Sequence, residues 1–247
     1  MPRVVAYHDV KSEQIARSFS NKTWFIPPSE AGLDLPVAHL SEGFPAPHGR
    51  VILPHFHPKD EFLVTVAGSG KIGRHDMAPY SVFFARAYTP YGPLSGDPET
   101  GITFFVLFAR HEVGADYLPE SRAKLMQVPN RRPWQLKRHV KFPEHAGGAI
   151  PTGIHLHEIP DLKDERGLFG CSLSMGPDTT TVAPDPSHGG GQYIVVVRGS
   201  MWHYDKEYKS YTLVFLRPDE GGFMLSAGSA GLEAIILNFP EPFTTTS

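Results

Sequence analysis

The sequence predicts an all-β protein built as two barrels in tandem. Glycine and proline each occur 24 times in 247 residues, so turns are frequent and short strands are favoured over long helices. Short runs of β-branched and aromatic residues recur, and the strongest of them covers residues 102–108. A shift of 131 positions also lays the second half of the chain on the first, placing His188 on His57.

The first half divides into a polar arm and a run of short strands. Residues 1–22 are expected to form an N-terminal arm, with a short helix over 11–19, and residues 23–112 the first barrel. Apolar, β-branched runs predict strands at 22–26, 35–40, 50–53, 62–66, 71–73, 81–85 and 102–108.

The second half repeats this pattern after a connection. Residues 113–150 are rich in proline and basic residues, and they predict a link with a short helix near 117–127. Residues 151–247 are expected to form the second barrel, in which 193–197 match 62–66 and 235–239 match 104–108. His155 and His157 are interpreted as ordinary strand residues there.

One stretch carries a candidate metal site. Residues two apart in a strand point to the same face, so His55 and His57 can present two imidazoles to one point. Glu61 joins them only if the chain turns at 58–60, because four extended residues would carry it roughly 13 Å away. Two imidazoles and a carboxylate suit Fe(II), and they also suit Zn, Mn, Ni or Cu. The alternative is a half-exposed strand followed by a solvated carboxylate.

The spacing Gly49-x5-His55-x-His57-x3-Glu61-x6-Gly68 resembles the first signature motif of the cupin superfamily. This resemblance implies double-stranded β-helix barrels of the jelly-roll type, with His55, His57 and Glu61 as ligands of one divalent transition metal, Fe(II) above all. Together with the repeat, it implies a bicupin.

The second barrel would be degenerate. Pro186 stands at the position of His55 and Gln192 at that of Glu61, which leaves only His188 of the ligand set. One imidazole and one amide make a weak site, so no tight metal is expected there.

A second cupin motif would add a later histidine, and Tyr91 stands at its place here. Three alternatives follow. Tyr91 ligates the metal or hydrogen-bonds a substrate or water; His75 or His111 completes the ligand set; or three protein ligands leave open positions. The third is favoured, with Tyr91 as a catalytic donor, because a phenol with a reference pKa of about 10 ligates poorly at neutral pH. A decayed, non-catalytic barrel is the remaining interpretation.

Composition limits the partners and the compartment. The net charge is −3 without a long basic run, which argues against nucleic acid. Cys171 is the only cysteine, so no disulfide can form within the chain, and no apolar stretch reaches membrane-spanning length. A cytoplasmic protein is expected, and the resemblance adds a homodimer.

The aromatic residues of the first barrel predict an apolar cavity for a small molecule. Arg50, Lys59, Arg86 and Tyr88 are candidates for orienting an anionic substrate. The resemblance implies a mononuclear non-haem dioxygenase that acts on an aromatic or dicarbonyl compound with O2 as co-substrate. A metal-dependent isomerase, cyclase or decarboxylase, and a non-catalytic binding protein, are the alternatives.

Overall fold

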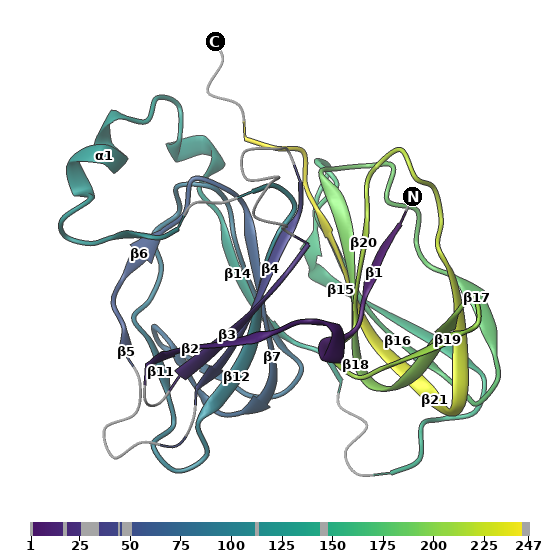
Figure 1. The fold of residues 1–247 in the computed structure, drawn as a ribbon. Coiled ribbons are helices and arrows are strands. Elements are labelled where there is room, and N and C mark those ends of the chain that lie inside the picture. The colour runs from purple at the N-terminus through teal and green to yellow at the C-terminus, as the bar shows by residue number, and fades with distance from the viewer. Residues whose placement is uncertain are drawn as a thin grey trace. The chain divides into compact units, whose positions relative to one another are not determined.

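The computed structural model describes residues 2–16, 19–25, 35–43, 45, 51–111, 114–143 and 148–243. The chain forms two compact units. Lys11–Lys141 with Pro242–Ser247 is called the first barrel here, and Met1–Val10 with Phe142–Glu241 the second barrel. Figure 1 shows β-strands throughout both units, which confirms the predicted all-β jelly-roll architecture. The motif residue Gly49 and the substrate candidate Arg50 lie outside the described residues.

The described part of the first barrel contains a seven-stranded antiparallel sheet with the order β14-β10-β7-β12-β4-β3-β2. Its strands are β2 (Ser12–Ala16), β3 (Phe19–Trp24), β4 (Val37–Gly43), β7 (Glu61–Gly68), β10 (Ser81–Ala85), β12 (Ile102–Phe108) and β14 (Lys137–Lys141). A four-stranded sheet, β5-β11-β8-β9, comprises β5 (Val51–Ile52), β8 (Gly70–Ile72), β9 (His75–Met77) and β11 (Leu94–Gly96). The last pair is β6 (His55–Phe56) with β13 (Asp116–Tyr117).

Alternating side chains of these strands build the interior. Leu63, Phe83 and Phe104 belong to one buried cluster, whereas Phe62 and Phe84 are buried on the opposite face with ring centroids 4.7 Å apart. Because both faces of the central strands are buried, their sequences are nearly continuous apolar runs. Strands β10 and β12 therefore have the bounds that the sequence predicts.

The described part of the second barrel contains one eight-stranded sheet. Its main path is β1-β20-β18-β21-β16-β15, and β17 and β19 pair with β21 and β18. The strands are β1 (Arg3–Val5), β15 (Ile154–Lys163), β16 (Phe169–Met175), β17 (Thr180–Val182), β18 (Gly191–His203), β19 (Lys206–Lys209), β20 (Leu213–Leu216) and β21 (Met224–Phe239). His155 and His157 lie in β15, as expected.

Strand pairing tests the predicted repeat. Leu63 pairs with Phe83 in the first barrel, and Ile194 pairs with Val214 in the second, which is the 131-residue shift. At Gly68 and Gly199, φ is 69° and 72°, and an added Cβ would lie 2.3 and 2.1 Å from the carbonyl oxygens of Gly101 and Gly231. Only glycine fits such a left-handed, close approach, so both barrels need it at the same turn.

The last strand of the repeat departs from that shift. Val106 pairs with Leu63, whereas Ile236 pairs with Ile194, so β21 follows β12 with an offset of 130. The predicted match of 104–108 with 235–239 is wrong by one residue. The reason is a link one residue shorter in the second barrel, between Leu225 and Gly231, than between Leu94 and Gly101.

Segments outside the predicted barrels also contribute strands. The predicted helix over 11–19 is wrong, because residues 12–16 form β2 and pair with β3. Residues 3–5 pair with β20, and residues 137–141 pair with β10, so the arm 1–22 and the connection 113–150 are not separate from the sheets. Cross-strand pairing overrides weak local propensity in these segments. The predicted helix near 117–127 is present as α1 (Arg122–Gln127).

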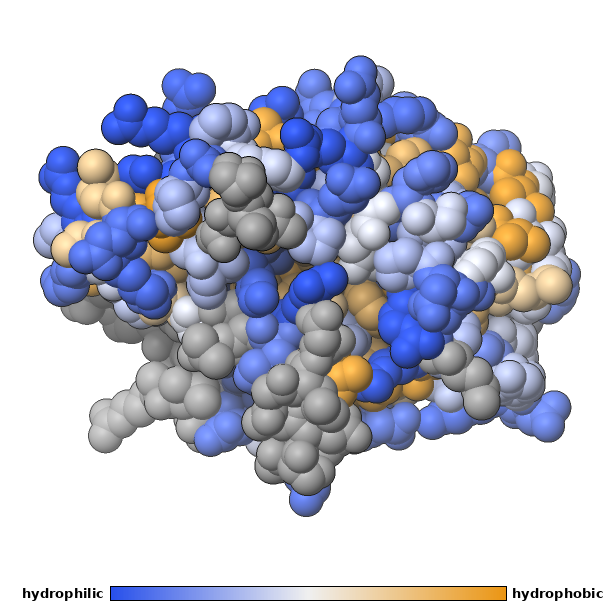
Figure 2. Space-filling view, turned by 90° about the horizontal axis from the view of Figure 1, so that it is seen from above, coloured by the Kyte–Doolittle hydropathy of each residue, from blue (hydrophilic) through white to orange (hydrophobic). Residues whose placement is uncertain are grey.

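Two further observations concern the surface of the protein and the length of its helices. The face seen in Figure 2 is mainly hydrophilic, with small hydrophobic groups scattered over it. The helices of the described residues are all too short to cross a lipid bilayer.

Candidate functional site

His55 and His57 stand at the entrance to β7. His55 lies in β6, where its backbone N–H donates to the Tyr91 carbonyl at 3.1 Å, and the Tyr91 N–H donates back at 3.0 Å. The two imidazoles are buried, and their ring centroids are 5.3 Å apart. Phe56 between them points to the other face and is fully buried, as the two-residue period of a strand requires. The two imidazoles therefore lie on one face.

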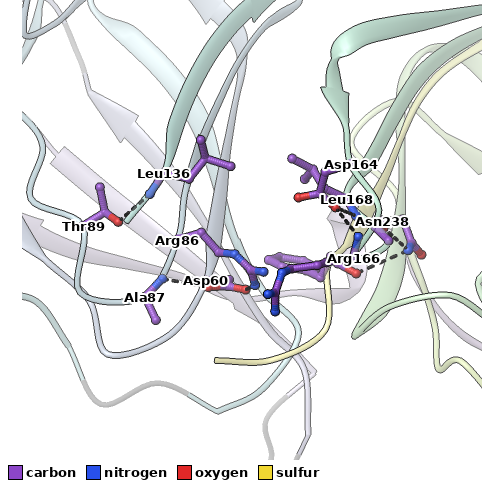
Figure 3. Close-up of polar contacts among 11 residues, drawn as sticks. Asp60, Arg86, Ala87, Thr89, Leu136, Asp164, Arg166, Leu168 and Asn238 are labelled. Carbon is purple, nitrogen blue, oxygen red and sulfur yellow. Dashed lines mark hydrogen bonds and ion pairs between the residues drawn. The ribbon is translucent and has the colours of Figure 1, made fainter. Parts of the chain in front are cut away.

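The turn that the spacing requires is present at 58–60. Asp60 Oδ1 accepts a hydrogen bond from the Ala87 N–H at 2.7 Å, and Asp60 Oδ2 accepts one from Arg86 Nη1 at 2.8 Å (Figure 3). The Arg86 guanidinium also lies 5.2 Å from the centroid of the Trp134 ring. Asp60 thus fastens the turn to the end of β10, and the chain comes back as β7.

This turn brings Glu61 to His57. Glu61 Oε2 lies 3.7 Å from His57 Nε2, and the side chain of Glu61 is 1% exposed. A carboxylate so deeply buried is costly without compensating contacts. The predicted return of Glu61 to the histidines is therefore observed for His57.

The hydrogen bonds of His55 define its tautomer. Nδ1 lies 2.7 Å from the Leu53 carbonyl oxygen, which can only accept, so Nδ1 carries the proton. In the neutral imidazole Nε2 is then the lone-pair nitrogen, and it accepts from the Tyr91 hydroxyl at 2.8 Å. A ring nitrogen that donates to a backbone carbonyl while the other keeps its lone pair is the usual arrangement of a metal-ligating histidine.

The donor types therefore fit a divalent ion, although they form two pairs and not one cluster. Among the described residues, no three His, Cys, Asp or Glu side chains converge in a way that could hold a metal. Glu61 adjoins His57, and His55 adjoins Tyr91. Sequence spacing placed these side chains in one neighbourhood but left their pairing open.

Tyr91 is the one of the three candidate additional groups that lies beside the histidines. Its ring centroid is 4.5 Å from that of His55 and 5.1 Å from that of Phe83. His75 instead stacks on His139 at 4.9 Å. Neither His75 nor His111 lines the cavity next to His55 in the described part of the chain.

A cavity of about 210 Å³ opens beside the two imidazoles. Part of its lining is apolar: Ile52, Leu63, Leu94, Phe104, Val106 and Phe108. The polar part comprises Asn21, His39, Ser41, His55, His57, Tyr91 and Tyr117, whereas Glu61 is not a lining residue. The ring of Phe108 packs on that of His57, with centroids 5.1 Å apart. The predicted cavity is present, with Phe104 and Phe108 in its lining, but about half of the lining is polar where a mainly apolar one was predicted.

Three of these lining residues, Asn21, His39 and Ser41, did not emerge as candidates from the sequence. The pattern that could have indicated them is an alternation of polar and apolar residues along a strand, as in β4. Of the predicted anion-orienting groups, Arg86 is held by Asp60 and is 3% exposed, and Lys59 is exposed. Tyr88 packs against Phe56 and Phe243. None of these three lines the cavity.

The second barrel differs at the matching positions. Gln192 is fully buried, and its Nε2 donates to the Pro184 carbonyl at 3.1 Å. His188 is exposed. Asn238 donates from Nδ2 to the backbone carbonyls of Gly167 and His188 in the same region. The absence of a tight metal there stays a prediction.

Comparison with known proteins gives structural relatives only. No protein-family model matches the sequence, and neither does any curated protein. The chain is similar in structure to the bacterial pirin YhhW from Escherichia coli in complex with nickel(II), with 11% identity, a TM-score of 0.60 and coverage of 98% of this chain and 100% of that one.

Two further solved structures are similar. For GK1651 from Geobacillus kaustophilus the identity is 13%, the TM-score 0.59 and the coverage 96% of this chain and 95% of that one. For oxalate decarboxylase from Bacillus subtilis the identity is 11%, the TM-score 0.58 and the coverage 96% of this chain and 76% of that one. At these identities the similarity concerns the fold alone.

Proposed function

We propose that the chain is a bicupin whose first barrel binds one divalent transition metal through His55, His57 and Glu61. The observation that carries this proposal is the arrangement of His55, whose Nδ1 donates to the Leu53 carbonyl and whose lone-pair Nε2 faces the Tyr91 hydroxyl at the cavity. Glu61, 3.7 Å from His57, provides the anionic donor. The nickel(II) complex of the similar pirin supports a divalent ion on this fold, with Fe(II) favoured and Zn, Mn, Ni or Cu as alternatives.

We further propose that this site oxidises a small aromatic or dicarbonyl molecule with O2. A bound divalent ion would polarise an oxygen donor of the substrate and, as iron, would take part in electron transfer. The apolar side chains of Leu63, Phe104 and Val106 shape the cavity and exclude water from the substrate. The Tyr91 hydroxyl donates to His55 Nε2 at the same end of the cavity, and it would be released to orient a substrate oxygen when that nitrogen ligates a metal.

Oxygen uptake tests the oxidative reaction. The protein is loaded anaerobically with Fe(II), and a panel of phenols and 1,3-dicarbonyls is added with O2. Consumption of O2 in proportion to a substrate, abolished in a His57→Ala variant, is the expected result. O2 uptake that is equal in wild type and His57→Ala, or absent with every compound, would contradict the oxygenase.

A metal-dependent decarboxylase is the second candidate, because one of the similar structures is an oxalate decarboxylase. Release of CO2 from a small dicarboxylate or keto acid, without stoichiometric consumption of O2, would favour it. The polar groups of the cavity would then hold a carboxylate. The cavity lining among described residues contains no Arg or Lys to pair with a carboxylate, which is why oxidation ranks first.

A further inference from the structure

We propose that Asn21, His39 and Ser41 form a recognition wall for the second polar end of the substrate. The substrate is then a single-ring, neutral compound with hydroxyl groups at opposite ends, of the dihydroxybenzene type. This inference rests on the proposed function, since it assigns one end of the molecule to the histidine end of the cavity.

The wall lies across the sheet from β7. Strand pairing sets Thr23 opposite His39, His39 opposite Val106, and Val106 opposite Leu63. Directly paired residues share a face, so the imidazole of His39 and the side chain of Leu63 both face the cavity that they line. With about 4.8 Å between neighbouring strands, the His39 backbone lies about 10 Å from that of Leu63.

Hydrogen bonds hold the wall in place. Thr23 Oγ1 lies 3.0 Å from His39 Nδ1, and Ser41 Oγ donates to Asn21 Oδ1 at 3.3 Å. Ser41 is 5% exposed. A buried hydroxyl group such as that of Ser41 destabilises a fold relative to an apolar group unless it gains hydrogen bonds, whereas the His39 imidazole is only half-buried. An equivalent barrel without these polar groups would show whether the fold itself requires them.

The second barrel of the same chain provides that comparison. Ile236 and Ala234 occupy the positions of Val106 and Phe104, because they pair with Ile194 and Val196 where the first barrel has Leu63 and Thr65. The residues opposite Ile236 and Ala234 are Cys171 and Leu173, and both belong to a closed apolar core. The residues opposite Val106 and Phe104 are His39 and Ser41.

The same fold thus closes with apolar residues where the first barrel has polar ones beside a cavity. Folding does not require His39 and Ser41, so we assign them to the recognition of a ligand. Polar residues on β3 and β4 line the same cavity as the two histidines and a set of apolar side chains, and this combination fits a molecule with an apolar body and polar ends.

Volume and charge define the class of ligand. An apolar cavity of about 150 Å³ holds benzene, so the 210 Å³ observed here accommodates one ring with small substituents. The side chains of the wall can both donate and accept hydrogen bonds. The described lining contains no Arg or Lys, which favours a neutral hydroxyl over a carboxylate.

A matched pair of probes tests the wall. Hydroquinone and phenol differ by one hydroxyl at the far end of the ring, and their dissociation constants are measured by anaerobic calorimetry on the protein as purified. Wild type is expected to bind hydroquinone roughly tenfold more tightly than phenol, as one or two hydrogen bonds would give. The His39→Ala/Ser41→Ala variant is expected to bind both equally.

Two further variants complete the design. Ser20→Ala is the matched control, because Ser20 donates to Glu42 at 2.9 Å on the opposite face of the same two strands, and its affinity ratio should equal that of wild type. Ser41→Leu introduces the residue of the second barrel and fills the cavity, so it should lose both probes while remaining folded. It therefore keeps the test valid if the alanine variant unfolds.

The outcomes separate the two proposals. An unchanged ratio in the His39→Ala/Ser41→Ala variant, or no binding of hydroquinone to wild type, would overturn the recognition wall. The metal content of the same preparations is measured in parallel. A wild-type protein without metal contradicts the proposed function, whatever the affinity ratio.

Discussion

The Tyr91 hydroxyl lies 2.8 Å from Nε2 of His55, the nitrogen that keeps its lone pair because Nδ1 donates to the Leu53 carbonyl. The backbones of the same two residues also exchange hydrogen bonds, so the phenol and the imidazole are fixed relative to each other. Tyr91 stands where a cupin would have its later histidine. The Tyr91 hydroxyl therefore lies beside the proposed metal site, and it replaces none of the three proposed ligands.

Tyr91→Phe removes this hydroxyl and keeps the ring. We expect the metal content to stay at the wild-type level and kcat to fall on the order of 10²-fold, the effect of losing a positioned donor. Tyr88→Phe is the control, because Tyr88 lies in the same barrel, packs against Phe56 and does not line the cavity. Loss of metal in Tyr91→Phe would make Tyr91 a ligand, and an unchanged kcat would remove it from the mechanism.

Asp60→Ala breaks the buried ion pair that fastens the turn between His57 and Glu61. Arg86 and Asp60 are 3% and 8% exposed and 2.8 Å apart, so the variant leaves a buried guanidinium without its carboxylate. We expect the free energy of unfolding to fall by about 3–5 kcal/mol in urea denaturation.

Asp76→Ala breaks an ion pair with Lys71 whose partners are 84% and 65% exposed, and it should change that free energy by less than about 1 kcal/mol. Similar losses in Asp60→Ala and Asp76→Ala would contradict a structural role for the buried pair.

The His139 imidazole should make stability depend on pH. Burial lowers the pKa of His139, and the neighbouring His75, stacked on it at 4.9 Å, lowers it further. The His139 imidazole then binds a proton more readily in the unfolded chain than in the folded one. The folded protein therefore loses stability as the pH falls below the histidine pKa of the unfolded chain, about 6.5.

We expect His139→Gln to weaken the decrease in unfolding free energy between pH 7.5 and pH 5.5. His157→Gln, at an exposed position of β15, should leave that decrease as in wild type. A pH dependence that is identical in all three proteins would show that His139 does not contribute.

The Cys171 thiol should be unreactive in the folded protein. Burial raises its pKa to about 12, and the charge of Glu158 acts in the same direction. Because the thiolate is the reactive form, a disulfide reagent at pH 8 should label almost no protein in minutes under native conditions and one thiol per chain in urea. Rapid native labelling would mean that the core around Cys171 opens easily.

The sequence correctly predicted the strands in which local β-strand propensity agrees with the burial that the whole fold imposes. Strands β10 and β12 are buried on both faces and have the predicted bounds. The turn before Glu61 follows from the length of an extended chain. Residues 12–16 were mispredicted, because pairing with β3 decides their conformation and a single sequence does not contain that information.

The recognition wall was missed for a related reason. His39 and Ser41 acquire meaning only through their partners Val106 and Phe104, and through the apolar Cys171 and Leu173 at the matching places. Spacing likewise places His55, His57 and Glu61 together without fixing which of them meet. Side-chain rotamers and the Tyr91 hydroxyl decide that, and they depend on the folded barrel.

Metal analysis of two matched histidine variants tests the central claim most directly. His57 and His188 occupy equivalent positions of the two barrels, so each is replaced by alanine, and bound metal is measured by mass spectrometry alongside wild type. We predict one divalent ion per chain in wild type and in His188→Ala, and almost none in His57→Ala. A wild-type protein without metal, or a metal that persists in His57→Ala, would contradict the proposed site.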